Sequence, residues 1–327
     1  MASHITSAST QPVSSIFPKD TLINGRPATI DCVRVAGQTY SLTGGFFKLL
    51  RLEDEWFESL NDPEAVIEAL RQQSQIAVDI FSFCQRVPDA VPKYSYRYEW
   101  ESVAVLTIDT YDRWWKQLES ATRNKVRKSQ KLGIEVRECV FDDEFVRGMT
   151  EIFNETPIRQ GRPFWHYGKD FETVKRQFSR YLFREQLIGA YYKDQLVGFI
   201  MLGDGGEFGD IGQIISKIEH RDKAVTNALV AKCVELCEKR RWKYLVYAKW
   251  MDSSLGDFKR QSGFAEMKLP RYFVPLTMKG KLILQLSLHR GLRQLLPKKL
   301  TQQLKQARKA WYGRLTAASR NHAPRLT

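Results

Sequence analysis

The feature that most constrains the fold is a strand-helix-strand unit in the second half of the chain. Apolar runs at 210–218 and 244–248 predict two strands, and residues 224–239 between them predict a long helix with one apolar face. A connecting helix of this length lets the two strands lie parallel in one sheet, joined by a right-handed crossover. Because parallel strands gather ligands at their carboxyl ends, we expect a binding site where these strands end.

The side chains at or just beyond these strand ends are the first candidates for that site. They are Gln213, Ser216, Lys217, Tyr247 and Lys249. Gln213 stands within an apolar run, so its amide needs a hydrogen-bond partner if it is buried. A purely structural role for Gln213 is the alternative, because most buried polar groups are hydrogen-bonded for structural reasons alone.

The segments around this unit extend it into a domain of alternating strands and helices. The remaining predicted strands are 133–139, 187–192, 196–202 and 273–276, and the remaining predicted helices are 142–154, 171–183 and 252–261. The K-D-Q link after residue 192 predicts a hairpin. The predicted order is therefore strand, helix, helix, three strands, helix, strand, helix, strand.

A loop rich in reactive side chains joins the first two helices of this order. Residues 154–167 read N-E-T-P-I-R-Q-G-R-P-F-W-H-Y, and the two prolines and the glycine rule out a continuous helix. Loops on a rigid scaffold carry function more often than other segments do. The alternative is that the arginines pair with acids and that Phe164 and Trp165 fill the edge of a core.

The order of elements resembles the GNAT acyltransferase fold over roughly residues 123–277. Two short motifs strengthen the resemblance. D-F-K-R-Q-S-G-F at 257–264 resembles the helix and Gly-Phe turn after the fifth strand of that family, and R-N-K-V-R-K-S-Q-K-L-G at 123–133 is similar to the basic helix that opens the catalytic half of FemAB-like proteins. These proteins add amino acids to peptidoglycan precursors and consist of two GNAT-like halves. The resemblance implies an α/β (α+β) fold with a GNAT-like mixed central sheet and flanking helices.

The resemblance also implies an acyl donor and places it at the start of helix 224–239. Acetyl-CoA users carry a glycine-rich turn there, whereas this chain has H-R-D-K-A-V-T-N-A, with Ala224 and Thr226 in place of glycines. Basic residues at a helix start still favour a phosphate group. The expected donor-binding residues are Gln213, Ser216, Lys217, His220, Arg221, Asn227 and Lys259. Acyl-CoA, an acyl carrier protein and aminoacyl-tRNA all remain open as donors.

Acyl transfer to an amine needs a base, a proton donor for the leaving group and donors to the oxyanion, but no covalent intermediate. No G-x-S-x-G elbow and no evident Cys-His pair are present, and we expect no metal. Glu155 and His166 are the candidate bases, and Tyr247 is the candidate proton donor. Arg159, Arg162 and Tyr167 are the candidate acceptor-binding residues, because guanidinium groups bind carboxylates and phosphates bidentately.

The first 120 residues contain weaker signals. Residues 29–35 and 38–42 predict a hairpin, 63–73 a helix capped by Asp62, 77–83 and 103–108 strands, and 111–118 a helix. The predicted domains are a disordered tail at 1–20, a reduced N-terminal GNAT-like half at 21–120, an acyltransferase domain at 121–280 and a basic tail at 281–327.

The basic tail carries most of the net charge of the chain. Of the net +14, the segment 281–327 contributes +11 and contains no acid, which leaves +3 for the first 280 residues. Leucines and Trp311 recur there at helical spacing on either side of Pro297, which predicts two basic amphipathic helices. Such helices fit an anionic membrane surface, the chain's own domain or a nucleic acid backbone.

Several classes of protein are disfavoured by the sequence. No apolar stretch is long enough to span a membrane, and the N-terminal residues do not resemble a secretory signal. Five scattered cysteines indicate free thiols, so we expect a cytoplasmic protein. We expect Cys233 and Cys237 to be buried as small hydrophobes. The basic tail would place the protein peripherally at the inner face of the membrane. The predicted function is acyl or aminoacyl transfer to an amine acceptor, such as a cell-envelope or lipid-linked precursor. The alternatives are a non-catalytic binding module of the same fold and a soluble N-acetyltransferase that uses acetyl-CoA.

Overall fold

A single mixed sheet of twelve strands runs through the part of the chain that the structure describes. The structure is a computed structural model that describes residues 13–23, 26–60, 62–73 and 76–291. In sheet order the strands are β1 (Phe17–Ile23), β2 (Arg26–Val35), β3 (Gln38–Thr43), β4 (Leu49–Leu52), β5 (Ile80–Cys84), β14 (Ala265–Pro275), β6 (Tyr98–Thr107), β13 (Tyr244–Lys249), β12 (Phe208–Ser216), β11 (Gln195–Asp204), β10 (Glu185–Tyr192) and β7 (Ile134–Cys139). A separate ribbon pairs β8 (Ile158–Arg159) with β9 (Arg162–Pro163).

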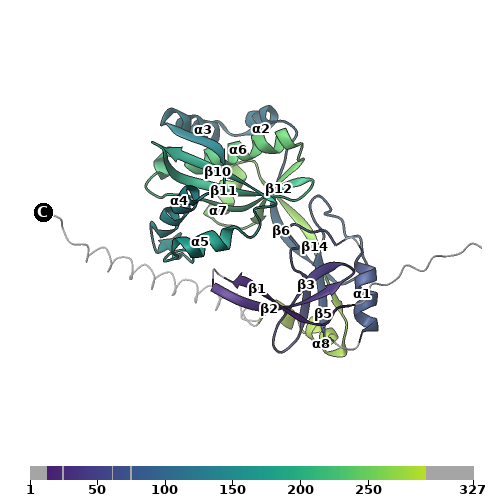
Figure 1. Ribbon diagram of the computed structural model, residues 1–327. Coiled ribbons are helices and arrows are strands. Elements are labelled where there is room, and N and C mark those ends of the chain that lie inside the picture. Colours follow the sequence, from purple (N-terminus) through teal and green to yellow (C-terminus); the bar gives the residue numbers. More distant parts are fainter. Residues whose placement is uncertain (1–12, 24–25, 61, 74–75, 292–327) are drawn as a thin grey trace, which may run out of the picture.

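Helices cover both faces of this sheet (Figure 1). They are α1 (Pro63–Gln72), α2 (Tyr111–Gln117), α3 (Ser120–Lys131), α4 (Asp143–Asn154), α5 (Phe171–Phe178), α6 (Val225–Arg240), α7 (Ser254–Gln261) and α8 (Met278–Gln285). A polar side chain accepts a hydrogen bond from the first turn at the start of six of them, including the predicted cap Asp62 of α1. These caps satisfy backbone N–H groups that have no partner within the helix.

The second half of the chain is a sheet with helices on either side. Helix α6 packs on β10, β11 and β12 over a core that includes Leu229, Val234 and Ile200, and α2 and α3 join it on that face. Helices α4 and α5 cover the opposite face, where Phe153, Met149 and Phe199 are fully buried. Figure 1 shows α2, α3 and α6 on one side of these strands and α4 and α5 on the other. The two layers leave the ends of β12 and β13 accessible between them.

The first part of the chain adds strands β1 to β5 and one covering helix. Helix α1 packs over β2 to β5 on a core of aliphatic and aromatic side chains, among them Tyr40, Phe81 and Tyr272. Helix α8 lies on the other face against Ile80 and Phe273. The predicted hairpin at 29–42 is confirmed as β2 and β3, and its turn uses the positive φ of Gly37.

Strand β14 joins the two parts of the sheet, and its predicted length is wrong. We expected a strand at 273–276, whereas β14 has eleven residues and pairs with β6 and with β5. The first half of β14 carries Glu266, Lys268 and Pro270, which hide the strand pattern. Strand β6 and helix α2 contribute Ala104 and Trp114 to the same core as α6, so one packed core extends across the predicted boundary at residue 120.

Three other predictions of segment limits are wrong where the structure describes them. Residues 17–20 of the predicted disordered tail belong to β1. Helix 171–183 ends at Phe178, because the chain turns at 179–184. The leucine spacing from 284 does not continue one helix, since α8 ends at Gln285 and Ser287 adopts a left-handed φ of 57°. The predicted amphipathic helices beyond residue 291 lie outside the described residues.

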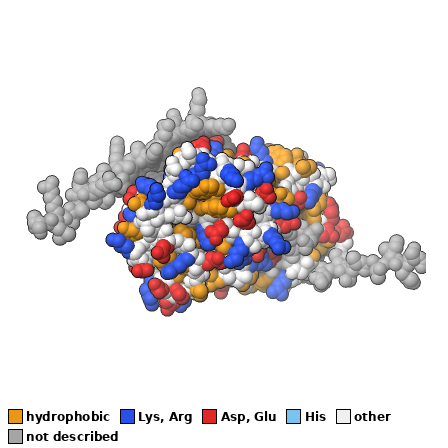
Figure 2. Space-filling model, turned by 90° about the horizontal axis from the view of Figure 1, so that it is seen from above, with side chains coloured by type: hydrophobic (Ala, Val, Ile, Leu, Met, Phe, Trp, Pro, Cys, Tyr) orange, Lys and Arg blue, Asp and Glu red, His pale blue; other side chains and the backbone are white. Residues whose placement is uncertain are grey.

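The described surface agrees with a nearly balanced charge. On the face shown in Figure 2, basic and acidic side chains are interspersed. Within the described ranges, no helix is both long enough and apolar enough to cross a membrane. Cys233 and Cys237 are fully buried in the α6 core, as predicted.

Candidate functional site

Strands β12 and β13 separate soon after they begin to pair. Their parallel pairing covers only Phe208–Asp210 of β12 and Tyr244–Val246 of β13. Beyond Asp210, the peptide groups of β12 that face β13 have no strand partner on that side. Buried peptide groups need hydrogen-bond partners, so a gap of this kind suits a ligand with amide groups of its own. The divergence lies at the carboxyl ends of the two strands, where the sequence predicted a site.

A cavity of about 480 Å³ occupies this divergence, and we call it the strand-end cavity. Its walls come from β12, from the start of α6, from α7 and from the loop 154–167. The lining residues are Arg159, Gln160, Phe164, Trp165, Gln213, Ile214, Ile215, Ser216, Lys217, Ile218, Arg221, Ala224, Val225, Thr226, Asn227, Tyr247, Ser254, Leu255 and Phe258. Five of the seven predicted donor-binding residues therefore meet in one cavity.

The start of α6 gives this cavity a positive end. Ala224 adopts a left-handed conformation with φ 53° and ψ 35°, so the backbone turns as a glycine would although no glycine is present. The first N–H groups of α6 then face the cavity without partners within the helix. Arg221 lines the same end, and among the described residues no carboxylate lies within 4.0 Å of its guanidinium. An anionic group such as a phosphate fits these donors.

Glu155 holds the predicted loop against the end of β12. Its carboxylate accepts hydrogen bonds from the backbone N–H groups of Ile218 at 2.6 Å and 2.8 Å and of Glu219 at 3.0 Å. It also pairs with Arg159 at 2.7 Å, and Arg159 donates to the carbonyl of Ser216 at 2.9 Å. With these donors on its carboxylate, Glu155 holds the loop in place, and the geometry favours a positioning role over the predicted role of a base.

His166 does not reach the strand-end cavity. Its side chain is 1% exposed, and its ring stacks on Phe153 with the centroids 4.1 Å apart. Burial, and then the charges of Lys169 and Arg159, lower the pKa of His166 to about 3. The ring therefore stays neutral within the α4 core, and its position does not support the predicted role of a base.

Tyr247 lies in the strand-end cavity as predicted, and Lys259 lies beneath it. Burial raises the pKa of the Tyr247 hydroxyl, which keeps this hydroxyl protonated at neutral pH. Lys259 is fully buried, and its ammonium donates to the carbonyls of Tyr247 at 2.6 Å and Lys249 at 2.8 Å. Lys259 therefore fixes the end of β13 and does not line the cavity where we expected it to bind the donor.

Three further predicted residues lie outside the cavity. His220 packs near Tyr192, with 5.2 Å between the ring centroids, and its Nε2 is 3.4 Å from Glu219. Arg162 and Tyr167 are exposed on the loop. The small ribbon β8–β9, whose turn has positive φ at Gln160 and Gly161, turns Arg159 inward and leaves Arg162 on the surface.

A second cavity of about 390 Å³ lies on the other side of the loop, and we call it the acidic cavity. It lies between the turn after β4, helix α5 and the first residues of β10 and β12. The lining residues are Glu53, Asp54, Trp56, Phe57, Trp165, Gln177, Phe178, Tyr181, Glu185, Met201, Asp210, Ile211, Gly212, Gln213 and Ala248. The cavity thus combines carboxylates with aromatic rings.

Glu185 and Asp210 are two carboxyl groups of this cavity with raised pKa values, and the sequence analysis identified neither. Burial, and then the charge of Asp210, raises the pKa of Glu185 to about 7. Burial raises the pKa of Asp210 to about 7 as well, although Arg86 lowers it in part. A carboxylate with a pKa near neutrality is suited to general base catalysis. Among the described residues, no group of three His, Cys, Asp or Glu side chains is arranged to hold a metal ion.

The two cavities adjoin at Trp165 and Gln213, which line both. Here β12 contains a bulge, because Met201 pairs with Gln213 and Leu202 with Ile211. Gly212 is therefore left without a partner on β11. A bulge redirects the local backbone and is common beside active sites. The two cavities are therefore neighbours at this point of β12.

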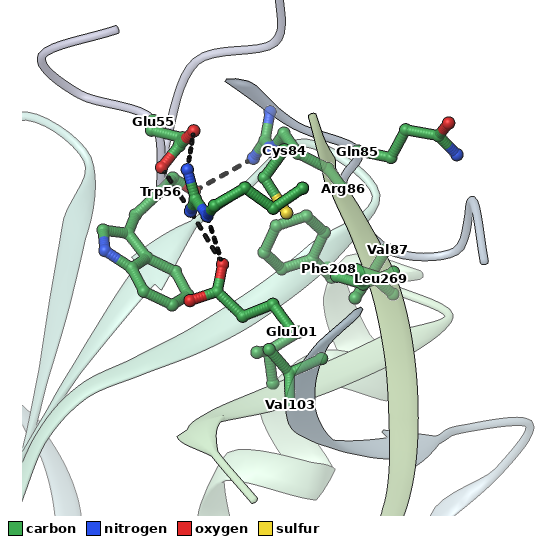
Figure 3. A pocket seen from close by; sticks show the side chains of 12 residues that line it. Glu55, Trp56, Cys84, Gln85, Arg86, Val87, Glu101, Val103, Phe208 and Leu269 are labelled. Atoms are coloured by element: carbon green, nitrogen blue, oxygen red, sulfur yellow. Dashed lines mark hydrogen bonds and ion pairs between the residues drawn. The ribbon is translucent and has the colours of Figure 1, made fainter. Parts of the chain in front are cut away.

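An ion-pair network supports the wall of the acidic cavity. Arg271 of β14 pairs with Glu55 at 2.7 Å and with Glu101 of β6 at 2.7 Å. In Figure 3 the side chains of Glu55 and Glu101 lie on either side of these dashed contacts, next to Trp56. A small cavity of about 40 Å³ separates the network from Phe208. Because Glu55 belongs to the turn that carries Trp56 and Phe57, Arg271 holds that turn over the acidic cavity.

Similarity to known structures agrees with this architecture. FemX superposes with a TM-score of 0.56 at 10% sequence identity, covering 83% of this chain and 90% of FemX. L-PGS from Bacillus licheniformis (TM-score 0.49, 12% identity, 77% of this chain and 85% of L-PGS) and a tandem GNAT protein from the clavulanic acid biosynthesis pathway (TM-score 0.43, 13% identity, 76% and 83%) also match. No protein-family profile and no curated protein sequence matches the chain. The similarity to FemX shows that the two chains share a fold, and it confirms the predicted FemAB-like GNAT fold.

Proposed function

We propose that the protein is an acyltransferase that moves an acyl or aminoacyl group from a donor in the strand-end cavity to an amine in the acidic cavity. The observation that carries this proposal is the junction of the two cavities at Trp165 and Gln213. Two reactants held on either side of such a junction gain the rate advantage of proximity and orientation. The shared fold with FemX supports the same class of reaction.

The donor is held by its phosphate and by its amide groups. A phosphate binds the start of α6 together with Arg221, while amides of the donor pair with the unpartnered peptide groups of β12 beyond Asp210. Acyl-CoA, an acyl carrier protein and aminoacyl-tRNA all present a phosphate. Gln213, Ser216, Lys217 and Asn227 line the path between the phosphate end and the junction.

We assign the base to Glu185. Its carboxylate has a pKa near 7, and one of its oxygens lies 3.4 Å from the point where a Cβ would stand on Gly212, next to the junction. The arriving ammonium gives one proton to Glu185 and becomes a nucleophilic amine. The peptide groups at the Gly212 bulge are the candidate donors to the oxyanion.

Tyr247 completes the transfer. The amine nitrogen forms a bond to the acyl carbon, and the bond from that carbon to the sulfur or oxygen of the donor breaks. The Tyr247 hydroxyl, which its raised pKa keeps protonated, gives its proton to the leaving atom and recovers one from the new amide nitrogen. Protons therefore balance, with one left on Glu185 for release to solvent.

The finer parts of the proposal concern the acceptor and the membrane. An amine of a cell-envelope or lipid-linked precursor remains the predicted acceptor, and residues 281–327 would hold the enzyme at an anionic membrane surface. The supporting observation is the charge of this segment, which contains eleven basic residues and no acid.

A transfer assay with matched variants tests the proposal. The full chain is incubated with acetyl-CoA or with aminoacyl-tRNA and a panel of amines, and products are identified by mass spectrometry. We expect Arg221→Met to raise the donor KM about ten-fold, the effect of losing one charged contact. Glu207→Gln, which changes an exposed residue directly before β12, is the control and should leave the donor KM unchanged. Absence of product with every donor, or an unchanged donor KM in Arg221→Met, would contradict the proposal.

A further inference from the structure

The charge of the acidic cavity points to the chemistry of the acceptor. Four carboxylates line it, those of Glu53, Asp54, Glu185 and Asp210, and the described lining contains no lysine, arginine or histidine. A cavity with one sign of charge and low-dielectric walls concentrates ligands of the opposite sign. Such a lining favours a cationic ligand over an anionic one.

Two of these carboxylates already have partners within the protein. Glu53 pairs with Lys19 at 2.6 Å and with Arg180 at 2.8 Å. Asp54 accepts a hydrogen bond from the hydroxyl of Tyr181 at 2.7 Å. These contacts tie the turn after β4 to β1 and to the turn after α5, so neither group depends on a ligand for compensation.

Glu185 and Asp210 differ from them. Among the described residues, neither carboxylate has a basic group within 4.0 Å or a side-chain hydrogen bond. Arg86 acts on Asp210 only at longer range, because its guanidinium donates to the hydroxyl of Ser59 and to the carbonyls of Trp56 and Gly205. The molecule thus keeps one buried carboxylate, Asp210, and one half-buried carboxylate, Glu185, without direct counterions, and a cationic ligand would stabilise the charged form of both.

The sheet sets the spacing of these two groups. Glu185 on β10 and Asp210 on β12 both pair with Gly203 of the intervening β11. Their α-carbons are therefore two strand spacings apart, about 10 Å. Gly203 has no side chain between them, and the ring of Phe57 lies only 2.5 Å from where a Cβ would stand on it. On this face of the sheet the two carboxylates flank Gly203, and the ring of Phe57 covers the glycine between them.

Aromatic side chains form the remaining walls. Trp56, Phe57, Trp165, Phe178 and Tyr181 surround the cavity. Such walls accept a methylene chain and also attract cations to the faces of the rings. A carboxylate on the ligand would instead be repelled by the acidic side chains of the lining.

From this arrangement we infer that the acceptor is an alkyl diamine, with one ammonium group at Asp210 and the other nitrogen at Glu185, next to the junction. The acylation of this diamine rests on the proposed function, whereas its binding to the acidic cavity does not. The nitrogen at Glu185 is acylated after that carboxylate takes its proton. The ammonium at Asp210 keeps its charge and selects the substrate. An α-amino acid with an uncharged side chain lacks the second ammonium group, and the carboxylate of any α-amino acid would lie against the acids of the lining.

Calorimetric titration of the full chain, without donor, tests the inference. The probes are 1,5-diaminopentane, pentylamine and 6-aminohexanoate, which share a similar chain and differ in the group at its far end. We expect the diamine to bind at least about ten-fold more tightly than pentylamine, the equivalent of one ion pair, and 6-aminohexanoate to bind most weakly. The preference for the diamine should shrink on going from about pH 8 to about pH 6, as both carboxylates take up protons. Burial and then Asp210 raise the pKa of Glu185, whereas burial raises the pKa of Asp210 and Arg86 lowers it in part.

Variants of residues in and near the acidic cavity test whether the amines bind there. Asp210→Asn should remove the preference for the diamine over pentylamine, and Gly203→Ala should weaken both because the added methyl group meets Phe57. The exposed Glu207→Gln is the matched control and should leave both affinities unchanged. Equal binding of diamine and pentylamine to the wild-type chain, a result that no folding defect can explain, would overturn the inference. Acyl transfer to monoamines would then still support the proposed function.

Discussion

Two carboxylates near the junction show how surroundings decide the role of a residue. Glu155 has three contacts from backbone N–H groups and one from a guanidinium, so its carboxylate is tied to the end of β12. Glu185 lies among aromatic rings with another carboxylate as its neighbour, which favours its neutral form. The sequence drew attention to Glu155 because its loop is rich in reactive groups. It contained no comparable signal for Glu185, whose neighbours come from four separate segments.

The raised pKa of Asp210 predicts that this residue destabilises the fold at high pH. In the unfolded chain the carboxyl has its ordinary pKa of 3.8, whereas in the folded chain its pKa is about 7. The folded state therefore holds the proton more tightly between these values, and stability falls as pH rises through this window. We expect Asp210→Asn to increase the free energy of unfolding by about 3 kcal/mol at about pH 8 and by little at about pH 4, measured by urea denaturation. An increase of the same size at both pH values would contradict the shift.

The positioning role of Glu155 makes a different prediction. Glu155→Gln should lower stability by about 1–3 kcal/mol, because an amide holds Arg159 and the two backbone N–H groups less well. It should weaken donor binding but keep a pH-rate profile with the same apparent pKa. Loss of the pH dependence in this variant would instead restore Glu155 as the base, as the sequence suggested.

At the scale of elements, the prediction from sequence was accurate wherever local patterns decide structure. The crossover β12–α6–β13, the hairpin β10–β11 and the capped helix α4 all follow from apolar spacing and capping residues, and all were confirmed. Strand β14 was mostly missed, because Lys268 and Pro270 obscure its pattern while its long-range partners β5 and β6 determine its extent. The turn after β4 was not predicted as part of the site, since only the folded sheet brings it over β12.

The support of this turn by Arg271 can be tested directly. Arg271→Met leaves Glu55 and Glu101 without their shared guanidinium, so we expect the free energy of unfolding to fall by about 3 kcal/mol. The acceptor KM should rise because Trp56 and Phe57 lose their support, whereas the affinity for donor should not change. Arg260→Met, which removes an exposed arginine paired with Asp257, is the matched control. An equal loss of donor and acceptor affinity would show general unfolding and not a loosened turn.

At the scale of the whole molecule, the residues of the strand-end cavity could be predicted from the sequence better than those of the acidic cavity. The residues Gln213, Ser216, Lys217, Arg221 and Asn227 follow one another on a strand and the helix after it, so local order brings them into one cavity. The acidic cavity combines the turn after β4 with α5, β10 and β12. Its chemistry depends on the register that places Glu185 and Asp210 beside Gly203, and register across three strands is a property of the folded sheet.

The charge distribution of the chain predicts that the basic tail and the folded body act separately. Deletion of residues 292–327 should abolish flotation of the protein with vesicles that contain anionic lipid and leave diamine binding unchanged, because the acidic cavity lies wholly within the described body. Vesicles of neutral lipid provide the control. Undiminished flotation of the shortened chain would place any membrane contact on the body.

The central claim is that Glu185 takes the proton of an amine that meets the donor at the junction of the two cavities. The most direct test is the pH dependence of acyl transfer to 1,5-diaminopentane by the wild-type chain and by Glu185→Gln, at saturating donor. We predict that the wild-type rate rises with pH through an apparent pKa near 7, and that Glu185→Gln loses at least about 100-fold in kcat together with this dependence. A Glu185→Gln enzyme that keeps the wild-type rate and pH profile would contradict the account.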